Sequence, residues 1–247
     1  MTAPPPGTQT LARGLAVIRA VAGGATTLRA LVDRTGLGRS TAHRLAQLLV
    51  AEGYLRSGRD GYTLGPTLIE LGFQALHGNP LPVVARPVLE ELSAQLRDTV
   101  HLAVRDGDSV LYLDKLAGTR GAEMRSRIGH RMPLTRTGVG MALLLDSAPE
   151  WRSLFRAEAA GQVDDQDVEA FLARMREYAE AGVAMDLEDN EPGIRCVAAP
   201  IRDAGGAIAG AVSVSATRPY MPAARMRGLT AVVGRAAAQV SAALGHH

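Results

Sequence analysis

Eight polar and basic residues near the N-terminus have the types and the spacing that binding to nucleic acid requires. Ser40 and Thr41 can donate hydrogen bonds to phosphate at the start of a helix, and arginines on the same helix face can reach guanine or phosphate. Two further arginines follow on a short hairpin, where they would contact the DNA backbone or the minor groove. The predicted DNA-binding residues are Arg39, Ser40, Thr41, His43, Arg44, Gln47, Arg56 and Arg59.

The elements that must position these residues follow the order of a winged helix-turn-helix. Apolar spacing predicts a first helix that ends at Gly23 and a second over residues 27–35, begun by a capping threonine. A glycine-rich turn at residues 36–38 precedes a third helix over residues 39–52, and a hairpin at 54–64 completes the unit. The alternative is a small helical domain whose arginine face is merely exposed to solvent.

Charge divides the chain of 247 residues into two parts, although its overall net charge is only +2. Residues 1–78 carry eight arginines and four acidic residues, a net charge of +4, whereas the remainder is slightly acidic. The break falls at residues 78–82, where glycine and two prolines interrupt a helix. A compact basic module ahead of a larger acidic one indicates that double-stranded DNA is bound at the front.

Several classes of protein are not expected from the sequence. Residues 1–9 hold three prolines and no basic side chain, so we expect no signal peptide, and the most apolar run, residues 139–145, is too short to cross a membrane. We therefore expect a soluble, cytoplasmic protein. The single cysteine, Cys196, excludes a disulfide scaffold and a thiolate zinc cluster. Dinucleotide loops, phosphate loops and protease motifs are all missing, so we expect no enzyme, no cofactor and no metal site.

The pattern after residue 82 favours a mixed α+β domain. A helix over residues 83–97 is followed by a hairpin of strands 100–104 and 110–113, and by a third strand near Met124. Hairpin-linked strands with helices to one side predict an antiparallel sheet and not a doubly wound fold. The further elements that we expect are helices over residues 137–145, 165–181 and 222–244 and strands over residues 196–201 and 207–216.

Several of these segments resemble the IclR family of bacterial transcriptional regulators. Residues 39–45, 52–55 and 62–65 are similar to the N-terminal domain of that family, and residues 129–138 and 190–201 are similar to its effector domain. The resemblance runs in unbroken order over residues 10–244.

The resemblance implies a fold and a function. It implies a winged helix-turn-helix DNA-binding domain over residues 8–65, a linker helix within 66–80 and a GAF-like effector-binding domain over 81–247. A protein of this kind is expected to be a transcriptional regulator, more often a repressor, that binds a palindromic operator as a homodimer or homotetramer. Its effector is expected to be a small organic or aromatic acid, a carboxylate-bearing metabolite.

The resemblance also implies an effector pocket. The N–H groups of Gly138 and Val139 at the start of a helix suit a carboxylate. Ser213 and Ser215 are two residues apart on a strand and so share one face. The implied effector-binding residues are Met124, Met132, Gly138, Val139, Asp186, Ile194, Cys196, Ser213 and Ser215.

Other interpretations of these residues stay open at this point. Cys196 could instead be a small buried residue that only packs in the core, as could the two methionines. Asp186 could instead be a loop residue that caps backbone N–H groups. Arg136, where the family more often has a small residue, would pair with an acidic effector or face solvent. The rival to a DNA-binding regulator is an enzyme or metabolite sensor whose helix-turn-helix module binds a protein.

Overall fold

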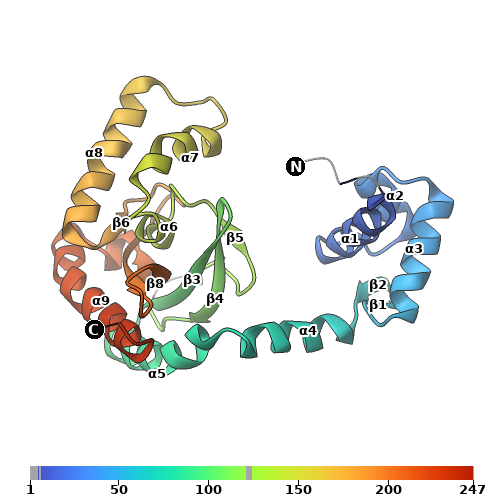
Figure 1. Cartoon of the computed structure of the whole chain (residues 1–247), viewed down its shortest axis with the longest axis horizontal. Helices are drawn as coiled ribbons and strands as arrows, with labels where there is room; N and C mark the ends of the chain where they lie inside the picture. The colour runs from blue at the N-terminus through green and yellow to red at the C-terminus, as the bar shows by residue number, and fades with distance from the viewer. Residues whose placement is uncertain (1–4, 6, 121–123, 247) are drawn as a thin grey trace. The chain divides into compact units, whose positions relative to one another are not determined.

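The computed structural model describes residues 5, 7–120 and 124–246, and the chain divides into two compact units, residues 1–79 and 80–247. Figure 1 shows the elements of each unit. Within the described residues, no helix has both the length and the apolar character needed to cross a membrane.

The first unit has the helix-turn-helix and the two-stranded wing that the sequence predicts. Three helices come first, then an antiparallel hairpin and a fourth helix. The elements are α1 (Gln9–Ala22), α2 (Leu28–Thr35), α3 (Arg39–Ala51), β1 (Leu55–Gly58), β2 (Gly61–Leu64) and α4 (Pro66–His77).

The turn between α2 and α3 is set by local chemistry. The Oγ1 of Thr27 accepts a hydrogen bond from the N–H of Ala30 at 3.2 Å, which caps the start of α2. Gly36 ends α2 at φ +66°, in the left-handed region that glycine adopts without strain. The small core beneath the turn includes Leu31 and Leu45, both buried. This core fixes which face of α3 is left exposed.

The wing is tied to the helices by backbone hydrogen bonding. The N–H of Tyr62 on β2 donates to the carbonyl of Thr26 at 2.7 Å, and the Tyr62 ring is buried in the same core as Leu55. Gly61, at φ +97°, lies so close to Thr26 that a Cβ there would overlap the carbonyl oxygen. The hairpin is therefore held against the loop between α1 and α2.

The second unit is a six-stranded antiparallel sheet with helices on both faces. The strand order is β5-β4-β3-β8-β7-β6, and every neighbouring pair is antiparallel. The strands are β3 (Thr99–Asp106), β4 (Ser109–Leu116), β5 (Arg131–Met132), β6 (Ala184–Asp186), β7 (Ile194–Arg202) and β8 (Ile208–Thr217). The helices are α5 (Pro80–Leu96), α6 (Gly138–Leu143), α7 (Trp151–Glu158), α8 (Asp165–Ala181) and α9 (Ala223–Ala243).

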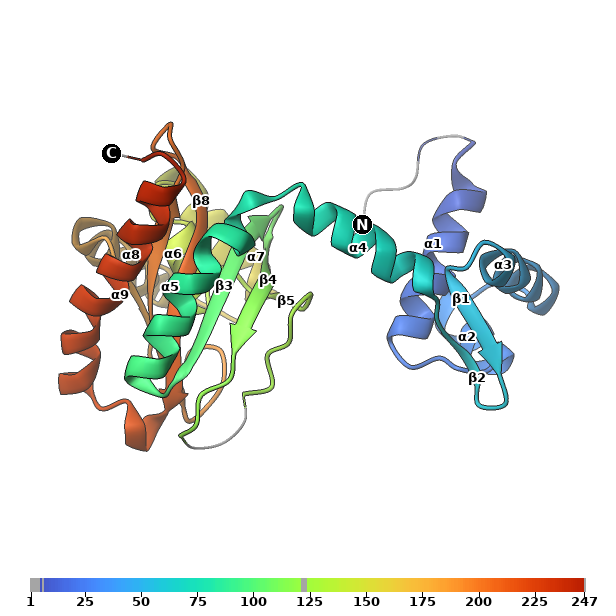
Figure 2. The same cartoon turned by 90° about the horizontal axis from the view of Figure 1, so that it is seen from below.

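The expectation of helices on one side of this sheet is wrong. Helices α5 and α9 pack on one face, whereas α6, α7 and α8 cover the other, as Figure 2 shows. The reason is visible in the strands, because four consecutive residues of β7 from Cys196 are all buried. A strand that is buried on both faces must be covered on both.

The predicted third strand near Met124 is also wrong. Met124 lies outside any strand, and β5 comes later, at Arg131–Met132; residues 121–123 lie outside the described residues. The Nζ of Lys115 donates to the carbonyls of Met124 and Ser126, at 2.7 Å each. A side chain, and not a strand partner, therefore binds this segment.

The ends of some helices differ by a few residues from those that the sequence predicts. Helix α5 begins at Pro80 and not at residue 83, because proline is tolerated in the first turn of a helix, where its missing N–H would have no partner. Helix α6 ends at Leu143, two residues earlier than predicted. Helix α7 and strand β6 were not predicted.

Candidate functional site

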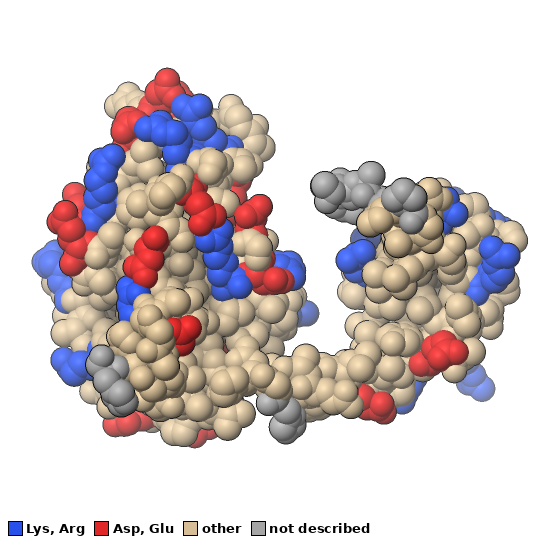
Figure 3. Space-filling model, in the orientation of Figure 1, with Lys and Arg blue, Asp and Glu red and all other residues tan. Residues whose placement is uncertain are grey.

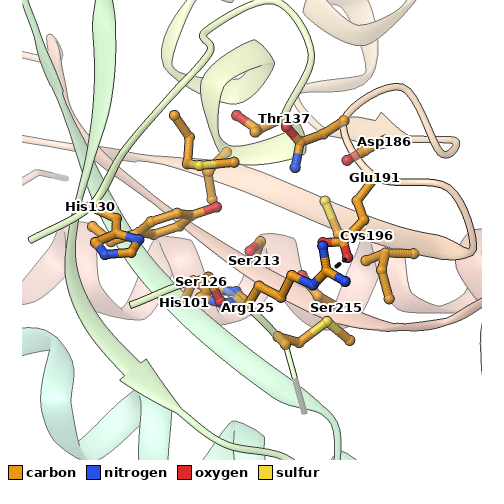
Figure 4. A pocket seen from close by; sticks show the side chains of 17 residues that line it. His101, Arg125, Ser126, His130, Thr137, Asp186, Glu191, Cys196, Ser213 and Ser215 are labelled. Atoms are coloured by element: carbon orange, nitrogen blue, oxygen red, sulfur yellow. Dashed lines mark hydrogen bonds and ion pairs between the residues drawn. The ribbon is translucent and has the colours of Figure 1, made fainter. Parts of the chain in front are cut away.

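The second unit contains a cavity of about 290 Å³ on the face of the sheet that α6 covers. All nine residues predicted to form an effector pocket line this cavity (Figure 4). Eight further residues complete the lining: His101, Tyr112, Arg125, Ser126, His130, Thr137, Asn190 and Glu191.

The sheet register brings the polar floor of the cavity together. Asp186 on β6 lies opposite Cys196 on β7, and Cys196 lies opposite Ser215 on β8. Two residues along β8, Ser213 lies opposite His101 on β3. Because alternate residues of a strand share a face, these side chains all point to the same side of the sheet. All five are buried.

The start of α6 is fixed by side-chain hydrogen bonds. The Oγ1 of Thr137 accepts from the N–H of Gly140 at 3.1 Å and donates to the carbonyl of Pro133 at 2.7 Å. The carboxylate of Glu158, on α7, accepts from the N–H groups of Leu134 and Thr135 at 2.6 and 2.9 Å. Helix α7, which the sequence did not predict, therefore helps to position the cavity wall.

The thiol of Cys196 occupies the space beside Gly138. Burial raises the pKa of this thiol, and hydrogen bonding from the N–H groups of Gly138 and Asp186 and from the Ser215 hydroxyl lowers it by less. A Cβ built at Gly138 would overlap the sulfur atom. The first turn of α6 and strand β7 are therefore in direct contact at this point, and a side chain at residue 138 would not fit.

Asp186 is both a loop cap and a cavity residue. Its Oδ1 accepts from the N–H groups of Glu188 and Asp189 at 3.0 and 2.8 Å. Burial is the main cause that raises the pKa of this carboxyl to about 7, and these backbone hydrogen bonds oppose the increase. Near neutral pH the carboxyl is therefore protonated in some molecules, where it can donate a hydrogen bond, and ionised in others, where it can only accept.

His101 forms the other end of the floor. Its Nε2 lies 2.7 Å from the Oγ of Ser126, and its Nδ1 is buried with no hydrogen-bond partner among the residues described. Burial, and after it the nearby charge of Lys115, lowers the pKa of His101 to about 3, so the imidazole is neutral. His101 is not among the residues that the sequence predicts for the pocket.

The remaining walls are mostly apolar. Met124 is buried and Met132 and Ile194 are half-buried along the cavity, so the interpretation of the methionines as packing residues is compatible with their place in the lining. At the rim, Arg125 pairs with Glu191 at 3.8 Å (Figure 4). Arg136 is not among the lining residues.

One feature of the sequence does point to a lining residue that was not predicted. Lys115 is the only lysine of the chain, and it lies opposite His101 on the neighbouring strand. His101 interrupts the apolar run of residues 100–104, which indicates a polar site on that face. The lining residues Ser126, Asn190 and Glu191 lie on loops, whose paths the strand pattern does not determine.

The first unit presents the residues predicted to bind DNA on one helix face and on the wing. Ala42, Leu45 and Ala46 of α3 face the core. Arg39, Ser40, His43, Arg44 and Gln47 are exposed on that helix, Thr41 is half-buried, and Arg56 and Arg59 are exposed on the wing.

The arginines of this surface are not neutralised by acidic side chains among the described residues. None of the four forms an ion pair in the part of the chain that the structure describes. In the second unit, by contrast, Figure 3 shows basic and acidic side chains mingled on the visible face. No group of three or more potential metal ligands is placed to bind a metal among the described residues.

Together these features define a class of protein: a winged helix-turn-helix unit joined to a sheet domain with a small internal cavity. Comparison with protein families agrees. Residues 10–59 match the IclR helix-turn-helix domain, and residues 73–242 match the C-terminal domain of the bacterial transcriptional regulator IclR. The chain belongs to the IclR family of transcriptional regulators.

Individual relatives support this assignment. The chain is 30% identical to the HTH-type transcriptional regulator KdgR of Escherichia coli over 88% of this chain and 85% of KdgR. It is also 30% identical to the DNA-binding transcriptional repressor YiaJ of Escherichia coli, over 85% of this chain and 79% of YiaJ. These relatives are regulators and not enzymes, in agreement with the sequence analysis.

A solved structure is similar over nearly the whole chain. The IclR homologue of Microbacterium hydrocarbonoxydans, crystallised in complex with 4-hydroxybenzoate, is 26% identical with a TM-score of 0.82. The alignment covers 95% of this chain and 98% of that structure.

Proposed function

We propose that this regulator is a repressor whose affinity for a palindromic operator changes when a small organic or aromatic acid binds in the cavity. The observation that carries the proposal is the convergence of all nine predicted effector residues on one cavity, in a chain whose other unit exposes unpaired arginines. The DNA-binding unit is assigned to residues 8–65, the linker to 66–80 and the effector domain to 81–247.

The DNA surface consists of the exposed residues of α3 and of the wing. Gly38 precedes α3 and makes no side-chain cap, so the first N–H groups of this helix remain available to phosphate. Arg44 and Gln47, farther along the exposed face, are placed to reach base edges. Arg56 and Arg59 on the wing would contact the backbone or the minor groove.

The cavity has the composition of a selective site for a small molecule. Polar groups, including Asp186, Ser213 and Ser215, line the cavity together with apolar side chains such as Met132 and Ile194. A volume of about 290 Å³ limits the effector to a small metabolite. The bound 4-hydroxybenzoate of the Microbacterium homologue supports an acid of this size as the ligand class.

Two copies of the chain are needed for useful specificity, because one winged unit reads few base pairs. The surface that we assign to a second copy is α4, where every residue from 68 to 76 is exposed, including Ile69 and Leu71. Such an apolar helix face is normally covered by a partner. The repressor role is supported by the name of YiaJ.

The experiment that tests this proposal has two parts. Bound genomic fragments are recovered and footprinted, and a dyad-symmetric site is expected. The protein is then heated with a panel of small acids, because a ligand that binds the native state raises its melting temperature. A footprint without symmetry would overturn the palindromic operator. A panel in which no acid raises the melting temperature would overturn the acid effector.

A further inference from the structure

One lining side chain of the cavity extends from β4 over the neighbouring strand. The Tyr112 ring packs against the His101 ring on β3, with 5.0 Å between the ring centroids and 39° between the ring planes. The Tyr112 hydroxyl lies within range of Cys196 on β7 and Asp186 on β6, because the charges of both groups influence its pKa. The side chain therefore extends across the sheet toward the polar floor of the cavity.

The position of the Tyr112 ring is fixed by the backbone on either side. The carbonyl of Tyr112 accepts from the N–H of Gly129 at 2.8 Å, and its N–H donates to the carbonyl of His130 at 3.2 Å. On the other edge, Tyr112 lies opposite Ala103 of β3. A tyrosine has only two side-chain torsions, so a fixed backbone and a packed ring leave its hydroxyl little freedom. The hydroxyl is therefore held at one place in the cavity.

The Tyr112 hydroxyl has no hydrogen-bond partner among the described residues. Whereas the surrounding atoms close off the Nδ1 of His101 entirely, the oxygen of this hydroxyl keeps accessible surface. Tyr112 lines the cavity and is only 7% exposed, so that surface opens into the cavity. Buried polar groups are nearly always paired with protein, water or ligand. The partner of this hydroxyl therefore has to be a molecule inside the cavity.

The Tyr112 hydroxyl is a permanent hydrogen-bond donor. Burial is the main cause that raises its pKa, and the nearby Cys196 and Asp186 raise it further, so the phenol stays protonated near neutral pH. Neighbouring polar groups of the floor are already engaged within the chain. The Ser215 hydroxyl is hydrogen-bonded with the Cys196 thiol, and the Oδ1 of Asp186 accepts from backbone N–H groups. Tyr112 thus offers a donor that no described residue uses.

We propose that Tyr112 determines which molecules the cavity retains, by donating a hydrogen bond from its hydroxyl to a strong acceptor oxygen of the bound ligand. The inference rests on the proposed effector site and adds to it a residue that is not among the nine predicted. A ligand of suitable shape that lacks such an oxygen leaves the phenol unpaired. Tyr112 is in this sense a specificity-determining residue.

The cost of an unpaired phenol explains the selectivity. A site built around a hydrogen bond rejects analogues that cannot make it, because its own buried group is then left without a partner. The preference is greatest for an ionised oxygen, because hydrogen bonds to charged groups are the strongest. Ser213 also lines the cavity, but its hydroxyl rotates to donate or to accept and so fits a wider range of ligands.

The test is calorimetric titration of the full chain with two matched pairs of probes: acetate and nitromethane, and benzoate and nitrobenzene. The members of each pair have the same shape, but the nitro compound is uncharged and is a much weaker acceptor. In the wild type, the acid of at least one pair should bind at least about 10-fold more tightly than its nitro analogue. Tyr112→Phe should weaken binding of that acid by about 10- to 100-fold and change binding of the nitro compound by less than about 3-fold.

Two other tyrosines provide matched controls. Tyr220→Phe removes an exposed hydroxyl outside the lining and should bind every probe as the wild type does. Tyr178→Phe removes a hydroxyl that donates to the carbonyl of Met185 at 3.0 Å, so its melting temperature should fall by about 2–4 °C. Tyr112→Phe loses no hydrogen bond to a described residue, so it should melt at or above the wild-type temperature. A purely structural role of the Tyr112 hydroxyl would instead lower that temperature.

A spectroscopic measurement completes the test. In carbon-13 spectra of protein labelled at the tyrosine Cζ, assigned with Tyr112→Phe, the bound acid should shift the Tyr112 signal more than those of Tyr178 and Tyr220. The inference is overturned if the Tyr112 signal does not shift, if Tyr112→Phe binds the acids within about 3-fold of the wild type, or if neither acid binds the wild type. The broad acid panel tests the proposed function separately. An acid that raises the melting temperatures of the wild type and of Tyr112→Phe alike would leave that function intact while this inference fails.

Discussion

Gly138 at the start of α6 lies against the Sγ of Cys196 on β7, so closely that a Cβ at residue 138 would overlap the sulfur atom. The close approach of this helix to the sheet explains why a glycine stands at that position. It also places the only thiol of the chain in the wall of the cavity. Substitution of either residue therefore tests how tightly the cavity is built.

Gly138→Ala should destabilise the second unit by about 1–3 kcal/mol, because the added methyl group forces the sulfur to move. In a Cys196→Ala background the same substitution should cost at least about 1 kcal/mol less, since the space is then free. Urea unfolding followed by the fluorescence of Trp151, the only tryptophan, measures this unit. Additive effects of the two substitutions would contradict the contact.

Asp186 should lower stability above neutral pH. Burial raises its pKa to about 7 from an ordinary value of 3.8, so between pH 4 and 7 the native state holds a proton that the unfolded chain releases. The free energy of unfolding therefore falls as pH rises through this window.

Asp186→Asn should then be more stable than wild type at pH 8 by about 1–4 kcal/mol, with the difference vanishing near pH 4. The matched control is Asp108→Asn, in an exposed turn. A constant difference across this pH range would refute the assignment.

His101 should have the opposite pH dependence. Its pKa is lowered to about 3 from 6.5, so between these values the unfolded chain binds a proton that the native state does not. Stability from this source is complete above pH 6.5 and is lost as pH falls. At pH 5 wild type should have lost about 2 kcal/mol that His101→Gln does not lose, whereas exposed His43→Gln keeps the wild-type slope. Parallel curves for wild type and His101→Gln would disprove this.

Arg44 and Arg59 should differ in their effects on DNA binding. If Arg44 contacts a base edge, Arg44→Ala should cost about 1–3 kcal/mol on the operator and relax sequence preference. Arg59→Ala, on the wing, should weaken operator and random duplexes alike. Arg29→Ala, in an exposed ion pair of α2, serves as the control. Identical behaviour of the Arg44 and Arg59 variants would show that these roles are wrongly assigned.

Binding to the operator should depend steeply on salt. A dimer that makes some six to ten phosphate contacts should lose about 10³- to 10⁵-fold in affinity between 50 and 200 mM salt. Arg59→Ala should flatten the slope by about one contact per protomer. A flat salt response of the wild type would be incompatible with the proposed surface.

Much of the first unit was predictable because its elements are local. The cap at Thr27, the left-handed Gly36 and the spacing of Leu45 in α3 are all short-range signals. The winged helix-turn-helix order follows from them directly.

The second unit was predictable only in part, because its cavity depends on contacts between distant residues. Its nine predicted lining positions came from family resemblance, and the structure brings them together. The binding of the segment at Met124 by Lys115 has no local signature in the sequence, so the apolar pattern alone predicts a strand there. His101 was not predicted to line the cavity, because only the packing of the other elements shows which face of its strand the cavity occupies.

A ligand in the cavity should change the affinity of the winged unit for its operator. The direct measurement is fluorescence anisotropy of labelled operator DNA, titrated with the protein in the absence and presence of the best-binding acid. We predict a shift in operator affinity of about 5- to 150-fold. In Ser215→Ala and Asp186→Ala the shift should be lost while ligand-free operator affinity is nearly unchanged. An undiminished shift in both variants, or no shift in the wild type at saturating ligand, would show that the cavity does not control DNA binding.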